Sequence, residues 1–208
     1  MLKQGLWISV SGIDGSGKTS LCRHIAKSFD NLLFMKIPYF NWARDMIKIS
    51  GNNNPYDDPH TDMLIFSASN RLEMYFIEQF IIKHDCLLTQ RCWLDNFPYR
   101  AAQGIDLKQS LHFLKPENFR KPDIIFYLKC NYKTAYNRIK NQKGDKYENL
   151  EFMKLLEKEF EKTFSQVNDN QFPIKFPNTK VIALDANKTS NSVLREAESH
   201  LKRLELLS

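Results

Sequence analysis

The stretch Gly12-Ile13-Asp14-Gly15-Ser16-Gly17-Lys18-Thr19 decides the fold of this chain, because it fits the pattern G-x-x-x-x-G-K-[ST] without a mismatch. A buried strand is predicted directly before it, at residues 6–10, and Leu21 and Ile25 follow at helical spacing. Glycines let the backbone turn tightly enough to aim several N–H groups at one point, and the start of a helix adds favourable partial charge there. We therefore predict that residues 12–19 bind the phosphates of a nucleoside polyphosphate.

The residues of this loop have separate expected roles. Lys18 is expected to reach the β- and γ-phosphates, and the Thr19 hydroxyl to be a ligand of Mg²⁺. A carboxylate inside a phosphate cradle is electrostatically unfavourable, so we expect Asp14 to face the phosphoryl acceptor; the alternative is an Asx turn that only stabilises the loop. The predicted ATP-binding residues of the loop are Gly12, Ile13, Asp14, Gly15, Ser16, Gly17, Lys18, Thr19 and Ser20.

Composition narrows the class of protein. The 208 residues suit a single domain, residues 1–208, and the net charge of +6 favours an anionic partner, which nucleotide phosphates satisfy. No run of interleaved basic and aromatic residues indicates nucleic-acid binding, and no apolar stretch approaches the length needed to span a membrane. The four cysteines are scattered without metal-ligand spacing. We expect a cytoplasmic protein that binds small-molecule nucleotides.

Hydrophobic patterning predicts the fold class. Short apolar segments that read as strands alternate with helical segments, and they lie at residues 6–10, 32–35, 86–89, 123–128 and 181–184. This order predicts an α/β protein of three layers, with a five-stranded parallel sheet and helices on both faces. The longest predicted helix covers residues 60–83, and its expected core face carries Ile65, Ala68, Leu72, Phe76 and Phe80. Ligands are expected at the carboxyl ends of the strands.

Further motifs, taken in order, resemble the thymidylate kinase family from Leu6 to about Asn187. The loop has the G-x-D-x-x-G-K form common in that family, and residues 64–71 (LIFSASNR) look like its L-L-F-x-A-x-R helix. Arg91 matches the arginine of D-R-[YFH]. The remaining matches are Asn96 and Tyr99 after Arg91, Lys121-Pro122-Asp123, Tyr147-Glu148 and Asp185-Ala186.

The resemblance implies a P-loop kinase fold with a short lid at about residues 138–148, and transfer of phosphate from ATP·Mg²⁺ to dTMP. It adds Arg138, Asp185 and Ala186 to the ATP-binding residues. Position 16 is Ser where some members have arginine, which implies that the lid supplies the catalytic cation, from Arg138 or Lys143. Relatives are commonly homodimers, and the helix at residues 60–83 is a candidate interface by that analogy.

The resemblance also implies an acceptor site. Arg91 would clamp the monophosphate with a bidentate fork, since two bound polyanions need cations between them. Phe66 would stack on the base and Tyr99 would pack near the sugar. The expected acceptor-binding residues are Asp14, Lys36, Phe66, Asn70, Arg71, Arg91, Asn96 and Tyr99.

Some positions depart from the family pattern. Gln90 replaces the acidic residue of D-R-[YFH], and Cys92 replaces the following aromatic. Family members carry Arg four residues after the Phe, where this chain has Asn70, with Arg71 next. One step on a helix turns about 100°, so Asn70 and Arg71 cannot both point at the base. The sequence leaves the preferred base open.

Two alternatives remain beside a dTMP kinase. Gln90-Arg91-Cys92 resembles the E-R-S of deoxyribonucleoside kinases, and residues 134–138 resemble their lid helix. Such enzymes need a general base for the 5′-hydroxyl, usually a Glu directly after the first strand, where this chain has Ser11. The other alternative is a nucleotide-binding protein with little catalysis, which Gln90 and the lysine-rich lid favour.

Overall fold

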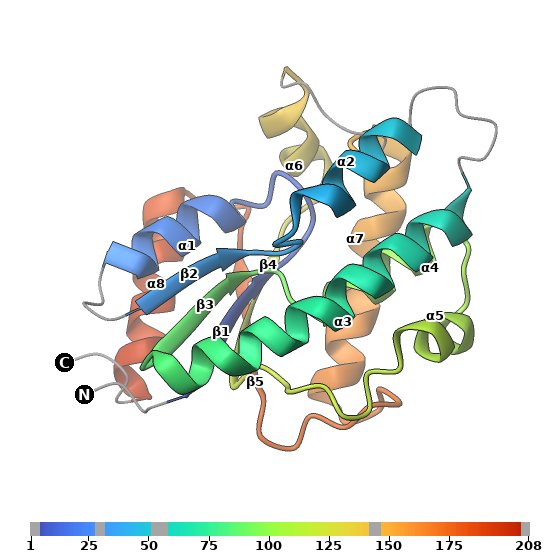
Figure 1. The fold of residues 1–208 in the computed structure, drawn as a ribbon. Helices are drawn as coiled ribbons and strands as arrows, with labels where there is room; N and C mark the ends of the chain where they lie inside the picture. Colours follow the sequence, from blue (N-terminus) through green and yellow to red (C-terminus); the bar gives the residue numbers. More distant parts are fainter. Residues whose placement is uncertain (1–4, 28–31, 51–57, 142–146, 205–208) are drawn as a thin grey trace.

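The computed structural model describes residues 5–27, 32–50, 58–141 and 147–204 (Figure 1). Its centre is a five-stranded sheet of order β2-β3-β1-β4-β5, in which every pairing is parallel. The strands are β1 (Leu6–Ser11), β2 (Leu32–Lys36), β3 (Cys86–Gln90), β4 (Ile124–Lys129) and β5 (Lys180–Asp185). The predicted fold class is therefore confirmed.

The three central strands are buried because their sequences are apolar on both faces. All residues of β1 and β3 are buried, and so is β4 up to Leu128. Trp7 fixes β1 between its neighbours: its indole Nε1 donates to Thr89 Oγ1 at 2.9 Å, and its backbone N–H donates to Asp123 Oδ2 at 2.8 Å. These bonds satisfy polar groups that burial would otherwise leave unpaired.

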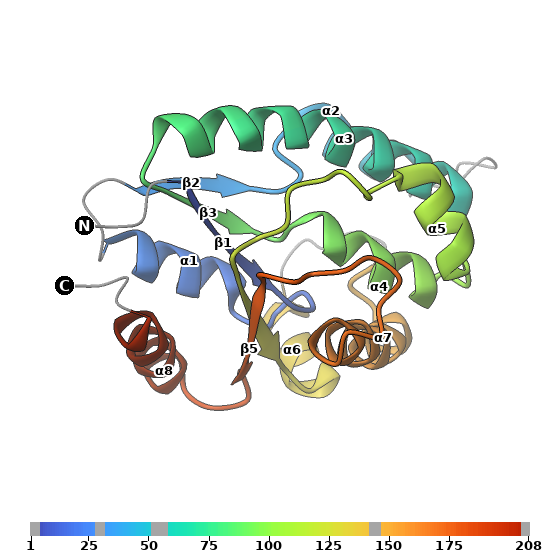
Figure 2. The ribbon, with the colours of Figure 1, turned by 90° about the horizontal axis from the view of Figure 1, so that it is seen from below.

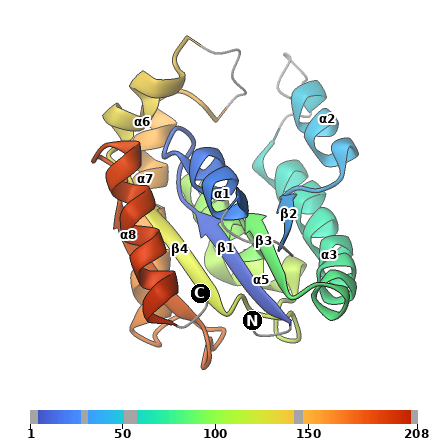
Figure 3. The same cartoon turned by 90° about the vertical axis from the view of Figure 1, so that its left-hand side faces the viewer.

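Helices cover both faces of the sheet, as Figures 2 and 3 show. One face carries α1 (Lys18–Lys27) and α8 (Ser190–Arg203), which pack together. The other face carries α3 (Pro59–Lys83), α4 (Asn96–Ala102) and α7 (Leu150–Asn168). Smaller helices pack on these: α2 (Asn41–Ser50) and α5 (Leu107–Leu114) on α3, and α6 (Tyr132–Ile139) on α7. A short 3₁₀ turn, Trp93–Asp95, links β3 to α4.

The core face of α3 differs from the prediction. Ala68 is exposed and Leu72 is 51% exposed, so the predicted face does not enter the core as a whole. Ile65 and Phe80 are half-buried against the core, so the prediction holds for only part of this face. The residues that are buried include Met63, Ser67, Asn70, Glu73, Met74, Ile77 and Ile81. No helix among the described residues is long and apolar enough to cross a membrane.

The phosphate-binding loop is packed closely by β4 and α6. Gly15 has φ +79°, and a Cβ atom there would lie 2.2 Å from the carbonyl oxygen of Ala135 in α6. Gly12 has φ +142°, and its Cβ would lie 2.8 Å from the carbonyl oxygen of Leu128 in β4. Only glycine avoids both the steric overlap and the unfavourable φ. The sequence pattern allows any residue at position 15. The structure shows that Gly15 is needed for the close approach of α6 to the loop.

Candidate active site

The loop between β1 and α1 lies between two cavities in the described part of the chain. One, of about 230 Å³, lies on the Asp14 side and is lined by residues from β2, α2, α3 and α4, from the turn after β3 and from the segment before α7. The other, of about 280 Å³, lies on the side of Ser16, Gly17 and Ser20, where it meets β4, α6 and the start of α8. Because Asp14 lines one cavity and Ser16 the other, a loop of eight residues separates the two cavities. We call them the acceptor cavity and the donor cavity.

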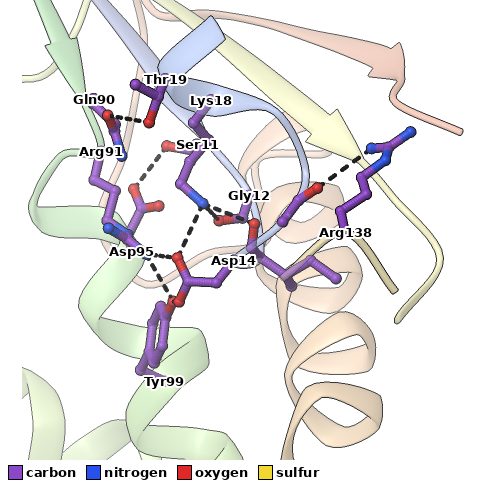
Figure 4. A network of polar contacts seen from close by, with 12 residues as sticks. Ser11, Gly12, Asp14, Lys18, Thr19, Gln90, Arg91, Asp95, Tyr99 and Arg138 are labelled. Carbon is purple, nitrogen blue, oxygen red and sulfur yellow. Dashed lines mark hydrogen bonds and ion pairs between the residues drawn. The ribbon is translucent and has the colours of Figure 1, made fainter. Parts of the chain in front are cut away.

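Lys18 is almost fully buried and bonds its own loop (Figure 4). Its Nζ donates to the carbonyl oxygens of Gly12 at 2.8 Å and Ile13 at 2.7 Å, and lies 3.4 Å from Asp14 Oδ1. Burial, and after it the positive charge of Arg91, lowers the pKa of Lys18 to about 8. Asp14 neutralises the charge of this ammonium group only in part, and a bound phosphate would complete the neutralisation.

Asp14, Arg91 and Tyr99 form a closed polar triangle in the acceptor cavity (Figure 4). Arg91 Nη2 donates to Asp14 Oδ1 and, at 3.0 Å, to the Tyr99 hydroxyl, which donates to Asp14 Oδ2 at 2.6 Å. Burial acts to raise the pKa of Asp14, but Arg91, Lys18 and Tyr99 together hold that pKa well below its usual range. The structure thus brings together three residues that the sequence assigned to the acceptor.

The backbone of Arg91 is unusual for a residue with a side chain. Its φ is +74°, and its N–H donates to the carbonyl oxygen of Val10 at 2.9 Å. A non-glycine residue in this region costs about 1–3 kcal/mol and persists where the surroundings fix it. The bond to β1 and the side-chain triangle provide that fixation, and they direct the guanidinium into the cavity.

Two neighbouring residues of α3, Asn70 and Arg71, point in different directions. Asn70 is buried and lines the acceptor cavity beside Phe66. Arg71 points away: its Nη1 donates to the carbonyl oxygen of Leu114 at 2.9 Å, and its guanidinium lies over the Phe119 ring. Contrary to the expectation from the sequence, Arg71 does not line this cavity, because its position on the helix turns it away. Lys36 and Asn96 line the cavity as expected.

The donor cavity brings together part of the expected ATP-binding set. Ser16, Gly17, Ser20, Arg138 and Ala186 line it. Arg138 Nη1 lies 3.3 Å from the carbonyl oxygen of Gly15, so α6 places this cation at the loop. Lys143 and the rest of 142–146 lie outside the described residues.

Asp185 is not among the residues that line the donor cavity. Its Oδ1 instead accepts hydrogen bonds from the backbone N–H and the side-chain amide of Asn187, at 3.1 and 2.9 Å. These bonds, the backbone one first, lower its pKa. Asp185 is the last residue of β5, and its side chain bonds the turn that follows, next to Ala186.

Sequence reasoning missed Asp95, a buried carboxylate in the acceptor cavity. Asp95 Oδ2 accepts from Ser11 Oγ at 2.7 Å and from the Cys92 N–H at 3.1 Å, while its Oδ1 has no partner. Burial raises its pKa. The 3₁₀ turn Trp93–Asp95 brings this carboxylate back to Ser11 at the end of β1, a juxtaposition that the sequence does not signal. Other lining residues that were not predicted include Ile37, Pro38, Arg44, Arg100 and Tyr147 in the acceptor cavity and Lys188, Thr189 and Ser190 in the donor cavity.

The residues present fit magnesium carried by a nucleotide. Thr19 Oγ1 is on an exposed residue and donates to Gln90 Oε1 at 3.0 Å, so two neutral oxygens lie together beside the loop. Mg²⁺ commonly takes few protein ligands together with phosphate oxygens and water. Within the described ranges, no group of three or more His, Cys, Asp or Glu side chains is placed to hold a metal ion by itself.

Comparison with known proteins agrees with this geometry. The sequence model of the thymidylate kinase family matches residues 10–195. A probable thymidylate kinase 1 of Saccharolobus solfataricus is 28% identical, over 91% of this chain and 93% of its own length. A thymidylate kinase of Dictyostelium discoideum is 26% identical, over 100% of this chain and 91% of its own length.

Among solved structures, a thymidylate kinase from Candida albicans superimposes with a TM-score of 0.76 at 17% identity. The superposition covers 98% of this chain and 93% of that one, and it shows the same fold. The family match takes in the phosphate-binding loop, α3, the Arg91 turn and the start of α8. On this evidence the chain belongs to the thymidylate kinase family.

Proposed function

We propose that this nucleoside monophosphate kinase transfers the γ-phosphoryl group of ATP to dTMP across the loop of residues 12–19. One observation carries the proposal: a cavity lies on each side of that loop, and the Lys18 and Arg91 cations lie beside Asp14 on the acceptor side. Such transfer is mainly a matter of positioning and of neutralising charge, and these cations serve both ends.

On the donor side, the loop N–H groups and Lys18 hold the phosphates, and Arg138 on α6 is the catalytic cation. Thr19 and Gln90 are the residues that would hold a nucleotide-bound Mg²⁺, whose contribution is to neutralise charge on the β- and γ-phosphates. To bind the γ-phosphate, Lys18 Nζ exchanges its bonds to two loop carbonyls for bonds to phosphate. In this exchange the ammonium group keeps its hydrogen-bond count and gains a negatively charged partner.

On the acceptor side, Arg91 clamps the monophosphate, with Lys36 and Arg44 as further cations in the same cavity. The low pKa of Asp14 keeps its carboxylate charged, so it accepts hydrogen bonds but does not remove a proton. Its oxygens then accept from Tyr99 and from the sugar hydroxyl of the acceptor. A monophosphate already carries its nucleophilic oxygen, so the transfer needs no general base.

The position of Asp95 favours an alternative activity, the phosphorylation of a nucleoside. Its carboxylate bonds Ser11 at the end of β1 and lines the acceptor cavity, where a nucleoside kinase needs a base. A coupled ADP-release assay over dTMP, dUMP, other monophosphates and thymidine separates the activities. The proposal expects dTMP to be the best acceptor; faster turnover of thymidine contradicts it, and turnover of none favours a binding protein without catalysis.

The exposed side of α3 supports a second proposal, a homodimer. Leu64, Leu72, Tyr75 and Ile82 are exposed by 51%, 51%, 63% and 70%, and with Ala68 they form one stripe along the helix. An apolar stripe of this kind is typical of a helix that packs on a partner. Leu72→Glu should give monomers in sedimentation velocity, whereas Leu155→Glu, equally exposed on α7, should not; an unchanged species for Leu72→Glu contradicts the dimer.

We also propose that the protein works in a reducing compartment, the cytoplasm. The four cysteines, all within the described residues, are buried free thiols, and burial raises the pKa of Cys22 and of Cys86 to about 12. Buried thiols of high pKa are structural and resist oxidation.

A further inference from the structure

Arg100 is a buried cation whose hydrogen bonds are incomplete. It lies on α4, is 1% exposed, and lines the acceptor cavity. Its guanidinium carbon lies 5.1 Å from the centre of the Phe66 ring, the proposed stacking surface for the base. Two of its nitrogens, Nε and Nη1, have no hydrogen-bond partner in the described structure. An unmet donor in a buried cation is costly, and a ligand that completes it explains why the residue is kept there.

The other contacts of Arg100 hold it in place beside the cavity. Tyr147 lies within hydrogen-bond reach of the guanidinium and donates to Asp62, which also accepts from Gln103 Nε2 at 2.8 Å. Asp62 belongs to α3 and Tyr147 precedes α7, so two further elements fix the position of a side chain from α4. Arg100 is therefore oriented before any ligand binds.

Asn70 offers the complementary group on the same cavity. Its Nδ2 donates to Glu73 Oε2 at 3.0 Å, and Glu73 Oε1 also accepts from Ser69 Oγ and from the Tyr39 N–H. These bonds fix the orientation of the Asn70 amide, because only its nitrogen can donate to Glu73. The amide oxygen, Oδ1, is buried and has no partner in the described structure. The cavity thus carries one unmet acceptor, on α3, and unmet donors, on α4.

We infer that Arg100 and Asn70 together read the base of the acceptor, with Arg100 supplying the cation that Arg71 does not. The Asn70 oxygen accepts from the ring N3–H of thymine, Arg100 donates to the neighbouring O4, and Phe66 stacks on the ring. The N3–O4 edge is the one farthest from the sugar, and Asp14 and Tyr99 lie at the sugar end. This assignment rests on the proposed dTMP kinase activity and adds to it the residues that recognise the base.

The test compares Arg100→Gln with Arg71→Gln, which removes the same charge from a side chain outside the cavity. Arg100→Gln should lower kcat/KM for dTMP by about 10- to 100-fold, the usual effect of losing a hydrogen bond to a charged group, with little change in KM for ATP. Arg71→Gln should leave the preference for dTMP over dCMP as it is. Thermal melting and calorimetry with ATP·Mg²⁺ are the checks that both variants fold. The reverse pattern, with the loss in Arg71→Gln, overturns the inference.

Base analogues provide a readout that a merely structural role would not change, and they need only the wild-type chain if Arg100→Gln does not fold. N3-methyl-dTMP, which lacks the donor for Asn70, and 4-thio-dTMP, a weaker acceptor for Arg100, should both be poorer substrates than dTMP. Arg100→Gln should lose the discrimination against 4-thio-dTMP and keep that against N3-methyl-dTMP. Equal use of dTMP and both analogues by the wild type overturns the inference, whereas failure of the wild type to make dTDP would refute the proposed function itself.

Discussion

Arg91→Gln tests how the acceptor phosphate is held. The change removes the guanidinium that joins Asp14 to Tyr99 and keeps a side chain of similar length. Gln and Arg have similar strain at φ +74°, so the backbone cost is the same in both proteins. The side chains of Arg91 and Asp14 are 16% and 23% exposed, and solvent therefore weakens their pairing. We expect a loss in unfolding free energy of about 1–3 kcal/mol, less than the 3–5 kcal/mol typical of a fully buried pair.

The effect on the acceptor should be larger than the effect on stability. A bidentate charged pair to the phosphate of a bound substrate contributes roughly 3–5 kcal/mol, which corresponds to about 10²- to 10⁴-fold in kcat/KM for dTMP. ATP binding should change little, because Arg91 lines the acceptor cavity and not the donor cavity. The assay is ADP release at varied dTMP, with calorimetry of ATP·Mg²⁺ as the companion measurement.

The control for charge is Arg23→Gln, at an exposed position on α1. It should leave both kinetics and melting as in the wild type. If Arg91→Gln uses dTMP as efficiently as the wild type, the clamp does not exist and Arg91 serves only to neutralise Asp14.

Three further predictions concern the loop and its metal site. Gly15→Ala should lower the melting temperature and raise KM for ATP, because the added Cβ would overlap the α6 backbone. The control is Gly104→Ala, at φ +85° with open space around it, which should lower the melting temperature by less because only the φ angle is unfavourable there. Gln90→Glu should lower the Mg²⁺ concentration for half-maximal activity by about threefold to tenfold, because it adds a carboxylate at the site; an unchanged Mg²⁺ titration would place the metal elsewhere. The pKa of Lys18 is about 8 in the free protein and should rise when phosphates bind, so ATP should bind with proton uptake at about pH 8.5. Calorimetry in buffers of different ionisation enthalpy measures this uptake. A binding enthalpy that is the same in all buffers would contradict the prediction.

The parts of the fold that follow from local sequence were predictable. Residues 12–19 and the apolar strands around them have patterns that few other structures satisfy, and the parallel sheet follows from strands alternating with helices. The face of α3 was not predictable in the same way, because Leu72 is as apolar as the residues that are buried. The buried face includes Glu73 and Asn70, whose hydrogen bonds involve a partner distant in sequence, Tyr39, and local apolar periodicity does not encode that pairing.

The candidate site shows the same division. The motif around Arg91 and Tyr99 correctly grouped residues that lie together. Arg91 is in the turn after β3 and Tyr99 is on α4, so their spacing in the sequence brings the two side chains close. Asp95 and Arg100 were missed because their importance arises from burial against Ser11 and Phe66, which no spacing rule encodes. Burial of a charged residue with unmet hydrogen bonds is a property of the folded chain.

The central claim is that two anions meet across the loop of residues 12–19, and a crystal structure with dTMP and a non-hydrolysable ATP analogue tests it directly. We expect the dTMP phosphate on Arg91 in the acceptor cavity, the γ-phosphate on Lys18, and the triphosphate along the Ser16 side of the loop. A structure in which both nucleotides lie on one side of the loop, or in which Arg91 remains on Asp14 without touching the acceptor phosphate, would contradict it.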